Sequence, residues 1–197
     1  NWASYGSVLN GINASLEEGG KVSGRVTSEY NGEPLPDVQI MALDDAGIGR
    51  YAGTTDASGN FLSEPLPPGA YRIRYYPEGS GFTAEHILEW YKDQPTQSTA
   101  DYIQVFEGLT TGGLDAALTR GGTISGVVTD ADTGLGIPNI EAMAQISGYD
   151  TRYTFTDSTG AYAVKGLPAG NARVTFFTHD TPYIPELYND HFFSTGQ

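Results

Sequence analysis

Alternating apolar residues indicate β-strands in two widely separated parts of the chain. Residues 21–27 and 123–129 each carry apolar or glycine side chains at every second position. Side chains alternate between the two faces of a strand, so each segment is predicted to bury one face. Similar alternation follows at 38–42, 71–75, 140–144 and 172–176. The one helical pattern, at 84–91, is short and ends before Pro95, so the chain is predicted to be all-β.

These segments belong to an internal repeat. The octapeptide GKVSGRVT at 20–27 is echoed by GTISGVVT at 122–129, an offset of 102 positions. Segments 56–61 and 66–69 recur at an offset of 101, and segment 89–93 recurs at an offset of 97. Because order and spacing match throughout, we interpret the chain as two copies of one module with slightly different loops.

Two turn sequences recur between the predicted strands. Asp-x-x-Gly lies between Thr-rich and aromatic segments, where an Asp side chain can bond the backbone and Gly can adopt positive φ, which suits a β-hairpin. Leu-Pro-x-Gly precedes an alternating strand, and its glycine is expected to need positive φ. The predicted structural turn residues are Asp56, Gly59, Gly69, Asp157, Gly160 and Gly170.

The series of landmarks, G-x-V/I-S-G-x-V-T, then D-x-x-G-x-F/Y, then L-P-x-G before a strand, resembles the carboxypeptidase regulatory-like module. The resemblance covers most of residues 19–190 and appears twice. It implies two tandem seven-stranded transthyretin-like (prealbumin-like) β-sandwich modules, related to Cna B-type and starch-binding-like folds. Such modules serve as stalks, spacers, adhesin segments, filament building blocks and sometimes glycan binders, so the resemblance implies no peptidase activity.

Some Cna B-type modules carry an intramolecular Lys-to-Asn isopeptide bond, and the resemblance would place such a lysine at Lys21. The second repeat has Thr123 at that position, and neither a matching Asn nor the catalytic acid is identified. The alternative is an ordinary lysine on an edge strand, where its charge discourages aggregation.

Composition narrows the classes of partner. The 197 residues include 10 Lys and Arg against 24 Asp and Glu, and the formal net charge is −14. This charge repels phosphate backbones and anionic lipid, so we expect neither nucleic-acid binding nor membrane insertion. The absence of Cys excludes disulfides and thiolate chemistry. The chain begins without Met and shows no signal-peptide pattern, which suggests a processed or excised chain.

Candidate catalytic and metal-binding residues are few. His86, His179 and His191 fall at non-corresponding places in the repeats and are interpreted as surface or loop histidines. Acidic pairs in loops offer oxygen ligands for Ca²⁺, although they match no EF-hand spacing and turn carboxylates are the favoured interpretation. These weak Ca²⁺ candidates are Asp44, Asp45, Asp130 and Asp132. No other cofactor and no catalytic residue is predicted, and the protein is expected not to be an enzyme.

Glycan binding is the competing hypothesis, with the chain as a carbohydrate-binding accessory module of a secreted enzyme. It requires exposed aromatic rings that stack on a sugar face. Trp90 corresponds to Leu187 in the second repeat, which favours an apolar packing position over a stacking platform. The remaining candidates are Tyr30, Tyr51, Tyr149 and Tyr153.

The repeats are unequal at their ends. After Tyr188 the second repeat has only nine residues, whereas the first continues through a predicted strand at 113–118. That strand, GLDAAL, matches GINASL at 11–16, again at an offset of 102. We therefore expect residues 1–18 to complete a neighbouring module, 19–120 to form the first sandwich, and 121–197 to form a second sandwich that lacks its last strands. The strand-donor residues would be Gly11, Ile12, Ala14 and Leu16.

These expectations favour a structural protein of an extracellular fibre, stalk or adhesin, secreted or on the cell surface. Its modules would join head-to-tail, either as separate subunits that add a β-strand to one another or as flanking repeats of a longer chain. Its partners would be copies of itself or adjacent repeats, with surface glycans as a further candidate.

Overall fold

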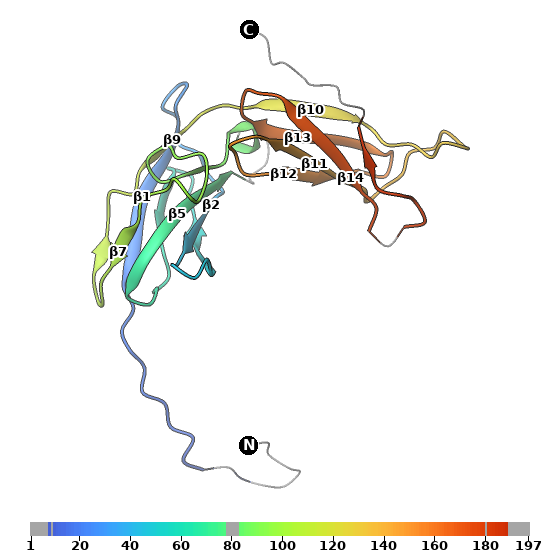
Figure 1. The fold of residues 1–197 in the computed structure, drawn as a ribbon. Helices are drawn as coiled ribbons and strands as arrows, with labels where there is room; N and C mark the ends of the chain where they lie inside the picture. Colours follow the sequence, from blue (N-terminus) through green and yellow to red (C-terminus); the bar gives the residue numbers. More distant parts are fainter. Residues whose placement is uncertain (1–7, 9, 78–82, 180, 189–197) are drawn as a thin grey trace.

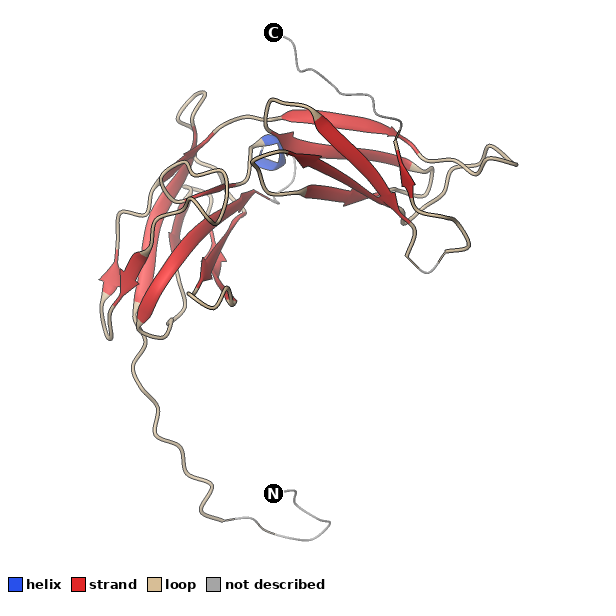
Figure 2. Ribbon diagram, in the orientation of Figure 1, coloured by secondary structure: helices blue, strands red, loops and turns tan. Residues whose placement is uncertain are grey.

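The computed structural model describes residues 8, 10–77, 83–179 and 181–188, which form two groups of β-strands (Figure 1). Figure 2 shows that strands dominate both groups, and the helical part of these residues is the short 3-10 helix η1 (Thr83–Glu85). The predicted all-β fold is confirmed. Within the same residues, no helix is long and apolar enough to cross a membrane.

The first module, defined by strands β1 to β9, is a sandwich of two sheets. One sheet has β1 between β4 and the short strands β8 and β9, and the other has the order β3-β2-β5, followed by the short strands β6 and β7. The first sheet contains β1 (Lys21–Ser28), β4 (Asn60–Leu62), β8 (Thr110–Thr111) and β9 (Ala116–Leu118). The second contains β2 (Val38–Leu43), β3 (Gly49–Thr54), β5 (Gly69–Pro77), β6 (Glu89–Trp90) and β7 (Ile103–Val105). Taking β6 with β7, and β8 with β9, as interrupted strands gives the expected seven positions.

The second module, defined by strands β10 to β15, repeats the arrangement of β1 to β6, and its described residues include no counterpart of β7, β8 or β9. One sheet pairs β10 with β13, and the other has the order β12-β11-β14-β15. The strands are β10 (Gly122–Val127), β11 (Glu141–Ile146), β12 (Arg152–Phe155), β13 (Ala161–Leu167), β14 (Ala172–Phe177) and β15 (Glu186–Leu187). Among the described residues, nothing takes the position that β8 and β9 hold in the first module.

Shared backbone details show that the two modules fold by the same local rules. Thr55 Oγ1 donates to Leu35 O at 2.6 Å and accepts from Val38 N at 2.9 Å. Thr156 Oγ1 makes the equivalent bonds, to Ile137 O and from Ile140 N. Each threonine is buried, so the paired bonds satisfy its hydroxyl inside the sandwich and fix the same corner in both copies.

The cores of the two modules differ in size. In the first, inward residues of both sheets form one cluster of sixteen buried side chains that includes Val22, Val26, Ile73 and Tyr75, all fully buried. The corresponding cluster of the second module contains six buried side chains, against which Ile124, Tyr162 and Phe176 pack only partly buried. Four members of the larger core, Ile103, Val105, Leu114 and Leu118, come from β7 and from the segment that closes the edge of β1, and neither has a counterpart among the described residues of the second module.

Two expectations about turns are wrong. Asp56 Oδ1 accepts hydrogen bonds from Ser58 N and Asn60 N, and Gly59 has a φ of 75°, yet the flanking strands β3 and β4 lie in different sheets. The turn, like its copy at Asp157 and Gly160, therefore crosses between sheets and is not a hairpin. Gly69 is already part of strand β5 and lacks positive φ, whereas Gly170 has a φ of 155°. The extended strand begins earlier in the first module, which removes the tight turn.

A set of polar contacts joins the modules. Gly121 N donates to Glu85 O at 2.7 Å, and Ile87 N donates to Thr119 O at 2.8 Å. The Arg120 guanidinium pairs with the Glu85 carboxylate through Nε at 3.1 Å. These bonds hold the segment between β9 and β10 against the first module, so the second module begins from a fixed base.

Candidate functional site

The open edge of β10 is the main structural difference between the modules. In the first module, β1 pairs with β4 on one edge and, in parallel, with β8 and β9 on the other. In the second, β10 pairs with β13, and among the described residues no strand pairs with its opposite edge. An open strand edge presents backbone donors and acceptors that another strand can use.

The first module shows how this edge is closed. Leu114 N donates to Ser23 O at 3.1 Å, and Arg25 N donates to Asp115 Oδ1 at 2.8 Å. Tyr75, from the opposite sheet, donates its hydroxyl to Leu114 O at 2.9 Å. Leu114 and Leu118 are 2% and 0% exposed, so residues 114–118 fill the space between the two sheets as well as pairing with β1.

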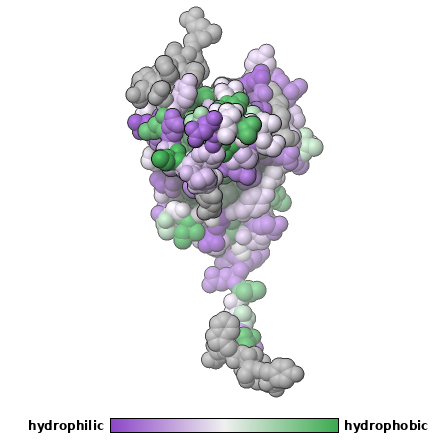
Figure 3. Space-filling view, turned by 90° about the vertical axis from the view of Figure 1, so that its right-hand side faces the viewer, coloured by the Kyte–Doolittle hydropathy of each residue, from purple (hydrophilic) through white to green (hydrophobic). Residues whose placement is uncertain are grey.

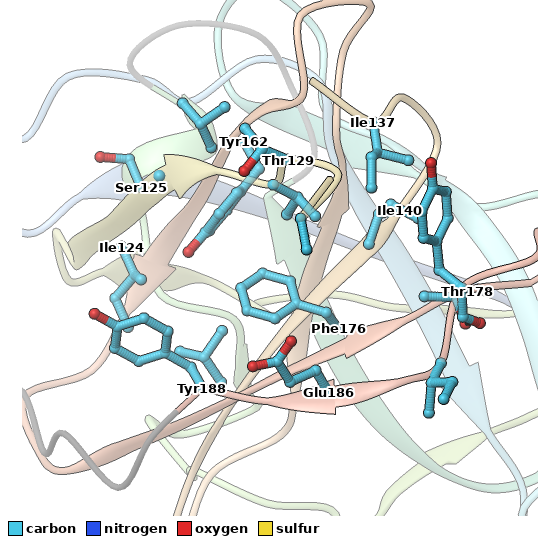
Figure 4. A pocket seen from close by; sticks show the side chains of 17 residues that line it. Ile124, Ser125, Thr129, Ile137, Ile140, Tyr162, Phe176, Thr178, Glu186 and Tyr188 are labelled. Atoms are coloured by element: carbon cyan, nitrogen blue, oxygen red, sulfur yellow. Dashed lines mark hydrogen bonds between the residues drawn. The ribbon is translucent and has the colours of Figure 1, made fainter. Parts of the chain in front are cut away.

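The second module has a groove of about 510 Å³ at the corresponding place. Figure 4 shows side chains from both sheets around it, with Tyr162 from β13 and Phe176 from β14 turned toward its interior. The rings of Tyr162 and Phe176 meet edge to face, with centroids 5.4 Å apart. Other apolar lining residues are Ile124, Val128, Ile137, Ile140, Val174 and Tyr188.

The groove residues are counterparts of buried core residues in the first module. Val22 and Val26 are 0% exposed, whereas their counterparts Ile124 and Val128 are only half-buried. Tyr75 is likewise fully buried, whereas its counterpart Phe176 is half-buried. The same side-chain pattern is therefore solvated in the second module because nothing described covers it. Sequence reasoning missed these acceptor residues, although the repeat alignment contained the signal.

Residues 11–16 carry the sequence that closes the first module but do not close the second module of their own chain. They lie in an extended segment at the far end of the first module, away from the groove (Figure 1). Ile12 is 80% exposed and Leu16 is 90% exposed. Gly11 has a φ of 76°, close to the 74° of its counterpart Gly113, so the segment already carries the backbone turn that precedes the closing strand.

The acidic Ca²⁺ candidates bond to their own loops. Asp44 Oδ1 accepts from Ala46 N and Ile48 N, at 3.0 and 2.9 Å. Asp130 Oδ1 accepts from Asp132 N and Thr133 N, and Oδ2 accepts from the Tyr183 hydroxyl at 2.9 Å. These hydrogen bonds, chiefly those from Thr133, lower the pKa of Asp130 to about 2.

The pair Asp44–Asp45 and the pair Asp130–Asp132 lie in different modules. No group of three or more His, Asp or Glu suited to a metal ion occurs in the part of the chain that the structure describes. The Ca²⁺ site therefore stays a prediction.

One histidine is not a surface or loop residue, contrary to the prediction. His86 is fully buried, with Nε2 3.0 Å from Ser28 Oγ, because η1 folds it back onto the end of β1. A Ser–His pair at this distance has the spacing of a nucleophile and base, but both side chains are buried, so a substrate has no access to it. His179 is exposed beside Glu141 at 3.1 Å, and His191 lies outside the described residues.

The candidate stacking tyrosines are exposed but scattered. Tyr30 and Tyr51 lie in the first module, and Tyr149 and Tyr153 in the second, each at least 39% exposed. Trp90 is 1% exposed and donates Nε1 to Asp150 Oδ2 at 3.0 Å, which makes it a packing residue between modules. Glycan binding stays a prediction.

The interpretation of Lys21 as a lysine on an edge strand is wrong, because β1 is paired on both sides.

Comparisons with solved structures find similar chains at low sequence identity. Among solved structures, the chain is similar to the Bacillus anthracis TIE protein at 18% identity and a TM-score of 0.38, covering 90% of this chain and 32% of that one. A streptococcal ancillary pilin matches at 16% identity and a TM-score of 0.36, over 86% of this chain and 57% of the pilin. The 5-hydroxyisourate hydrolase of Klebsiella pneumoniae matches at 18% identity and a TM-score of 0.33, over 56% of this chain and 94% of the enzyme. The chain thus spans about a third of the TIE protein and under two thirds of the pilin.

A search among curated proteins finds no match. The carboxypeptidase regulatory-like domain matches twice, over residues 21–101 and 123–180. These two ranges contain most of the strand and turn landmarks of both repeats and cover more than half of the chain. The chain therefore belongs to the carboxypeptidase regulatory-like domain family.

Proposed function

We propose that the chain is a non-catalytic structural protein of an extracellular fibre or stalk. Residues 11–16 of one copy insert into the groove beside β10 of another copy and complete its second module. The open groove carries this proposal, because its counterpart in the first module is filled by a segment of matching sequence. Residues 1–18 are then a donor segment, 19–120 a complete module, and 121–197 an acceptor module.

The first module supplies the expected register. There, Val26 pairs with Ala116 and Ser28 pairs with Leu118 in a parallel ladder. Shifting each partner by the repeat offset sets Ala14 of the donor opposite Val128, and Leu16 opposite Asp130. Asn13 of the donor replaces Asp115, and its side-chain oxygen can accept from Val127 N as Asp115 accepts from Arg25 N.

Burial of two apolar side chains supplies the driving force. Transfer of Ile12 and Leu16 from water into the groove is worth roughly 1.5 to 3 kcal/mol each. Backbone bonds along β10 add to this, whereas association costs several kcal/mol of lost translational and rotational freedom. The contact joins unlike surfaces, so each copy keeps one donor and one acceptor, and the expected product is a line of copies and not a closed dimer.

A structural role also agrees with the chemistry of the described residues. Among the described residues, the Ser28–His86 pair is buried, and the groove beside β10 is lined mainly by apolar side chains and matches a missing strand. An extracellular location is part of the same proposal. A reproducible turnover that one point substitution abolishes would contradict the non-catalytic assignment.

The test compares two adjacent substitutions in the donor segment. Leu16→Asp puts a charge at a position whose counterpart, Leu118, is fully buried, whereas Ser15→Asp puts the same charge where the counterpart, Ala117, is exposed. Sedimentation velocity over a concentration series should show assembly for the parent chain and for Ser15→Asp, and monomers for Leu16→Asp. A peptide of residues 8–20, added in excess, should cap the groove and stop assembly. Equal behaviour of the two variants, or a peptide that neither binds nor inhibits, would refute the proposal.

A further inference from the structure

Two side-chain contacts join the two modules of one chain. The repeat shows which other residues of the chain hold the corresponding positions. Trp90, at the end of β6, donates Nε1 to Asp150 Oδ2 at 3.0 Å and is 1% exposed. Asp150 precedes β12 in the hairpin that follows β11. The indole packs with Leu88 and Ala100 of its own module, and its Nε1 reaches the second module through this hydrogen bond.

The second contact is made by Arg152, at the start of β12. Its guanidinium carbon lies 4.9 Å from the ring centroid of Tyr76, and Nη2 donates to Pro77 O at 3.5 Å. Arg152 is 8% exposed, so the junction covers almost all of a long cationic side chain. Stacking of Arg on an aromatic ring is favourable when both are shielded from water.

Strand pairing identifies the counterparts without ambiguity. Ala42 pairs with Arg50 as Ala144 pairs with Arg152, which makes Arg50 the counterpart of Arg152 and, two positions earlier, Ile48 that of Asp150. Arg74 pairs with Trp90 as Thr175 pairs with Leu187, so Leu187 takes the place of Trp90. Phe177, two positions after Thr175, takes the place of Tyr76, two positions after Arg74.

These counterparts are exposed on two different modules and match in chemistry. Leu187 is 52% exposed on the second module and Ile48 is 56% exposed on the first, so an apolar pair replaces the Trp–Asp contact. Figure 3 views the outer end of the second module, where green apolar patches interrupt the polar surface. Arg50 is exposed and Phe177 is half-exposed, so the cation and its ring are retained.

The ion pair at the junction has lost both of its partners at the counterpart positions. Arg120 pairs with Glu85 within the chain, and their counterparts are Glu18 and Pro182. Loss of the cation is thus accompanied by loss of the anion, which avoids repulsion between two carboxylates. One contact does not transfer: Gly166 approaches His86 O closely, and the counterpart of Gly166 is Pro65, so a junction between copies is more open at that point.

We propose that the second module of one copy and the first module of the next form a junction in which Leu187 packs on Ile48 and Arg50 lies over Phe177. This inference rests on the proposed function, because residues 11–16 lead directly into β1 of the copy that carries Ile48 and Arg50. It adds a module-to-module interface to the strand contact and gives successive copies a fixed relative orientation.

Cross-linking of the full chain tests this interface. The parent chain has no Cys, so Ile48→Cys and Leu187→Cys each introduce one defined thiol on an exposed side chain. A mixture of the two variants should give a covalent dimer when it is treated with a short bismaleimide. The length of this reagent suits two positions whose counterparts, Trp90 and Asp150, are in direct contact. The matched control pairs Leu62→Cys with Leu187→Cys. Leu62 is 59% exposed, and its counterpart Ala163 is exposed although the second module takes part in the junction inside the chain.

The outcomes separate the interface from the strand contact. A cross-link for the 48/187 pair, absent for the 62/187 pair and lost when Leu16→Asp is added to the Ile48→Cys chain, supports both proposals. If the 8–20 peptide binds but the 48/187 pair does not cross-link above the control, the interface is refuted and strand insertion stands. If the cross-link persists with Leu16→Asp, the interface stands and strand insertion falls. If neither binding nor cross-linking occurs, both fall.

A second variant tests the interface without cross-linking. Ile48→Glu should weaken assembly about tenfold or more, because it places a carboxylate against Leu187. Leu62→Glu, an equal change of charge on the same module, should leave assembly unchanged. Equal assembly of the Ile48→Glu variant and the parent would refute the interface.

Discussion

The two modules share a strand order and corner hydrogen bonds but differ in how their cores are closed. In the first, Leu114 and Leu118 are buried between the sheets, whereas in the second the corresponding groove is lined by half-buried aromatic and aliphatic side chains. The second module thus keeps the strand order of β1 to β6 without a strand in the position of β8 and β9 among its described residues. In the first module the closing strand contributes burial that the described residues of the second module lack.

Chain connectivity explains why the first module can close itself. Asp115 bonds to Arg25 across 90 positions, so closure costs loop entropy, but the same chain holds the strand at a high effective concentration. A strand donated by another copy must also offset the loss of translational freedom. The second module is therefore expected to depend on concentration in a way that the first does not.

The largest contrast should come from placing a charge at the two equivalent leucines. Leu118→Asp buries a carboxylate in the closed first module and should destabilise it by about 3 to 5 kcal/mol, whereas Leu16→Asp should leave the stability of the monomer unchanged. Urea unfolding at a low protein concentration measures both. A large loss for Leu16→Asp in the monomer would show that residues 11–16 already pack within their own chain.

Two equivalent glutamates should differ in their effect on pH stability. Glu89 is 8% exposed, and desolvation, with smaller effects of Asp93 and Glu29, raises its pKa to about 8. Its counterpart Glu186 is exposed. Because the folded-state pKa of Glu89 lies above the unfolded value of 4.5, its contribution is fully present below pH 4.5 and is lost as pH rises toward 8.

Glu89→Gln should therefore stabilise the first module at pH 7.5, by roughly 1 to 3 kcal/mol, and flatten its stability between pH 5 and 8. Glu186→Gln should change neither property. Thermal unfolding at a series of pH values provides the measurement. An unchanged pH profile for Glu89→Gln would mean that this carboxyl is ionised at little cost in the folded protein.

The two Leu-Pro-x-Gly glycines should respond unequally to substitution. A Cβ on Gly170 would lie 2.9 Å from Ile146 Cγ2 at a φ of 155°, whereas a Cβ on Gly69 would meet only Tyr71 Cε2, at 3.7 Å. Gly170→Ala should cost about 1 to 2 kcal/mol, and Gly69→Ala should be neutral or slightly stabilising. Equal shifts in melting temperature would contradict this distinction.

The smallest contrast concerns a tyrosine hydroxyl that comes from one sheet in the first module and from the other sheet in the second. Tyr75 donates to Leu114 O, and its counterpart Phe176 has no hydroxyl, but Tyr162 gains one where the first module has Phe61. The Tyr162 hydroxyl lies 2.9 Å from the point that a Cβ on Gly126 would occupy. Leu114 O lies 2.2 Å from the corresponding point on Gly24. A hydroxyl thus stands beside the expected carbonyl of a donor strand in both modules.

Tyr75→Phe should cost about 1 kcal/mol in the first module, because it leaves Leu114 O without its donor. Tyr162→Phe should weaken binding of the 8–20 peptide by about fivefold and leave the fold intact. Calorimetric titration and urea unfolding measure the two effects. Unchanged peptide affinity would show that Tyr162 is only a packing ring.

The sequence by itself determined the strands, the repeat and the all-β class. Alternation such as that in 71–75 depends only on the two faces of a strand, and landmarks that recur in the same order at nearly the same spacing indicate two copies of one unit. It also identified 11–16 as the counterpart of 113–118, since matching glycines and leucines are local information. Glycine conformation was predicted less well, because Gly69 and Gly170 occupy the same motif but begin their strands differently.

Tertiary structure decided what these segments contact. The sheet order shows that the Asp56 turn crosses between sheets and that β10 lacks a partner strand among the described residues. The packing of η1 shows that His86 is buried on Ser28. The groove, its two-sheet lining and the exposed counterparts Ile48 and Leu187 depend on residues brought together from distant positions. Local patterns fix which face of a strand is apolar, but burial of that face depends on which other segment reaches it, and this is a property of the assembled fold.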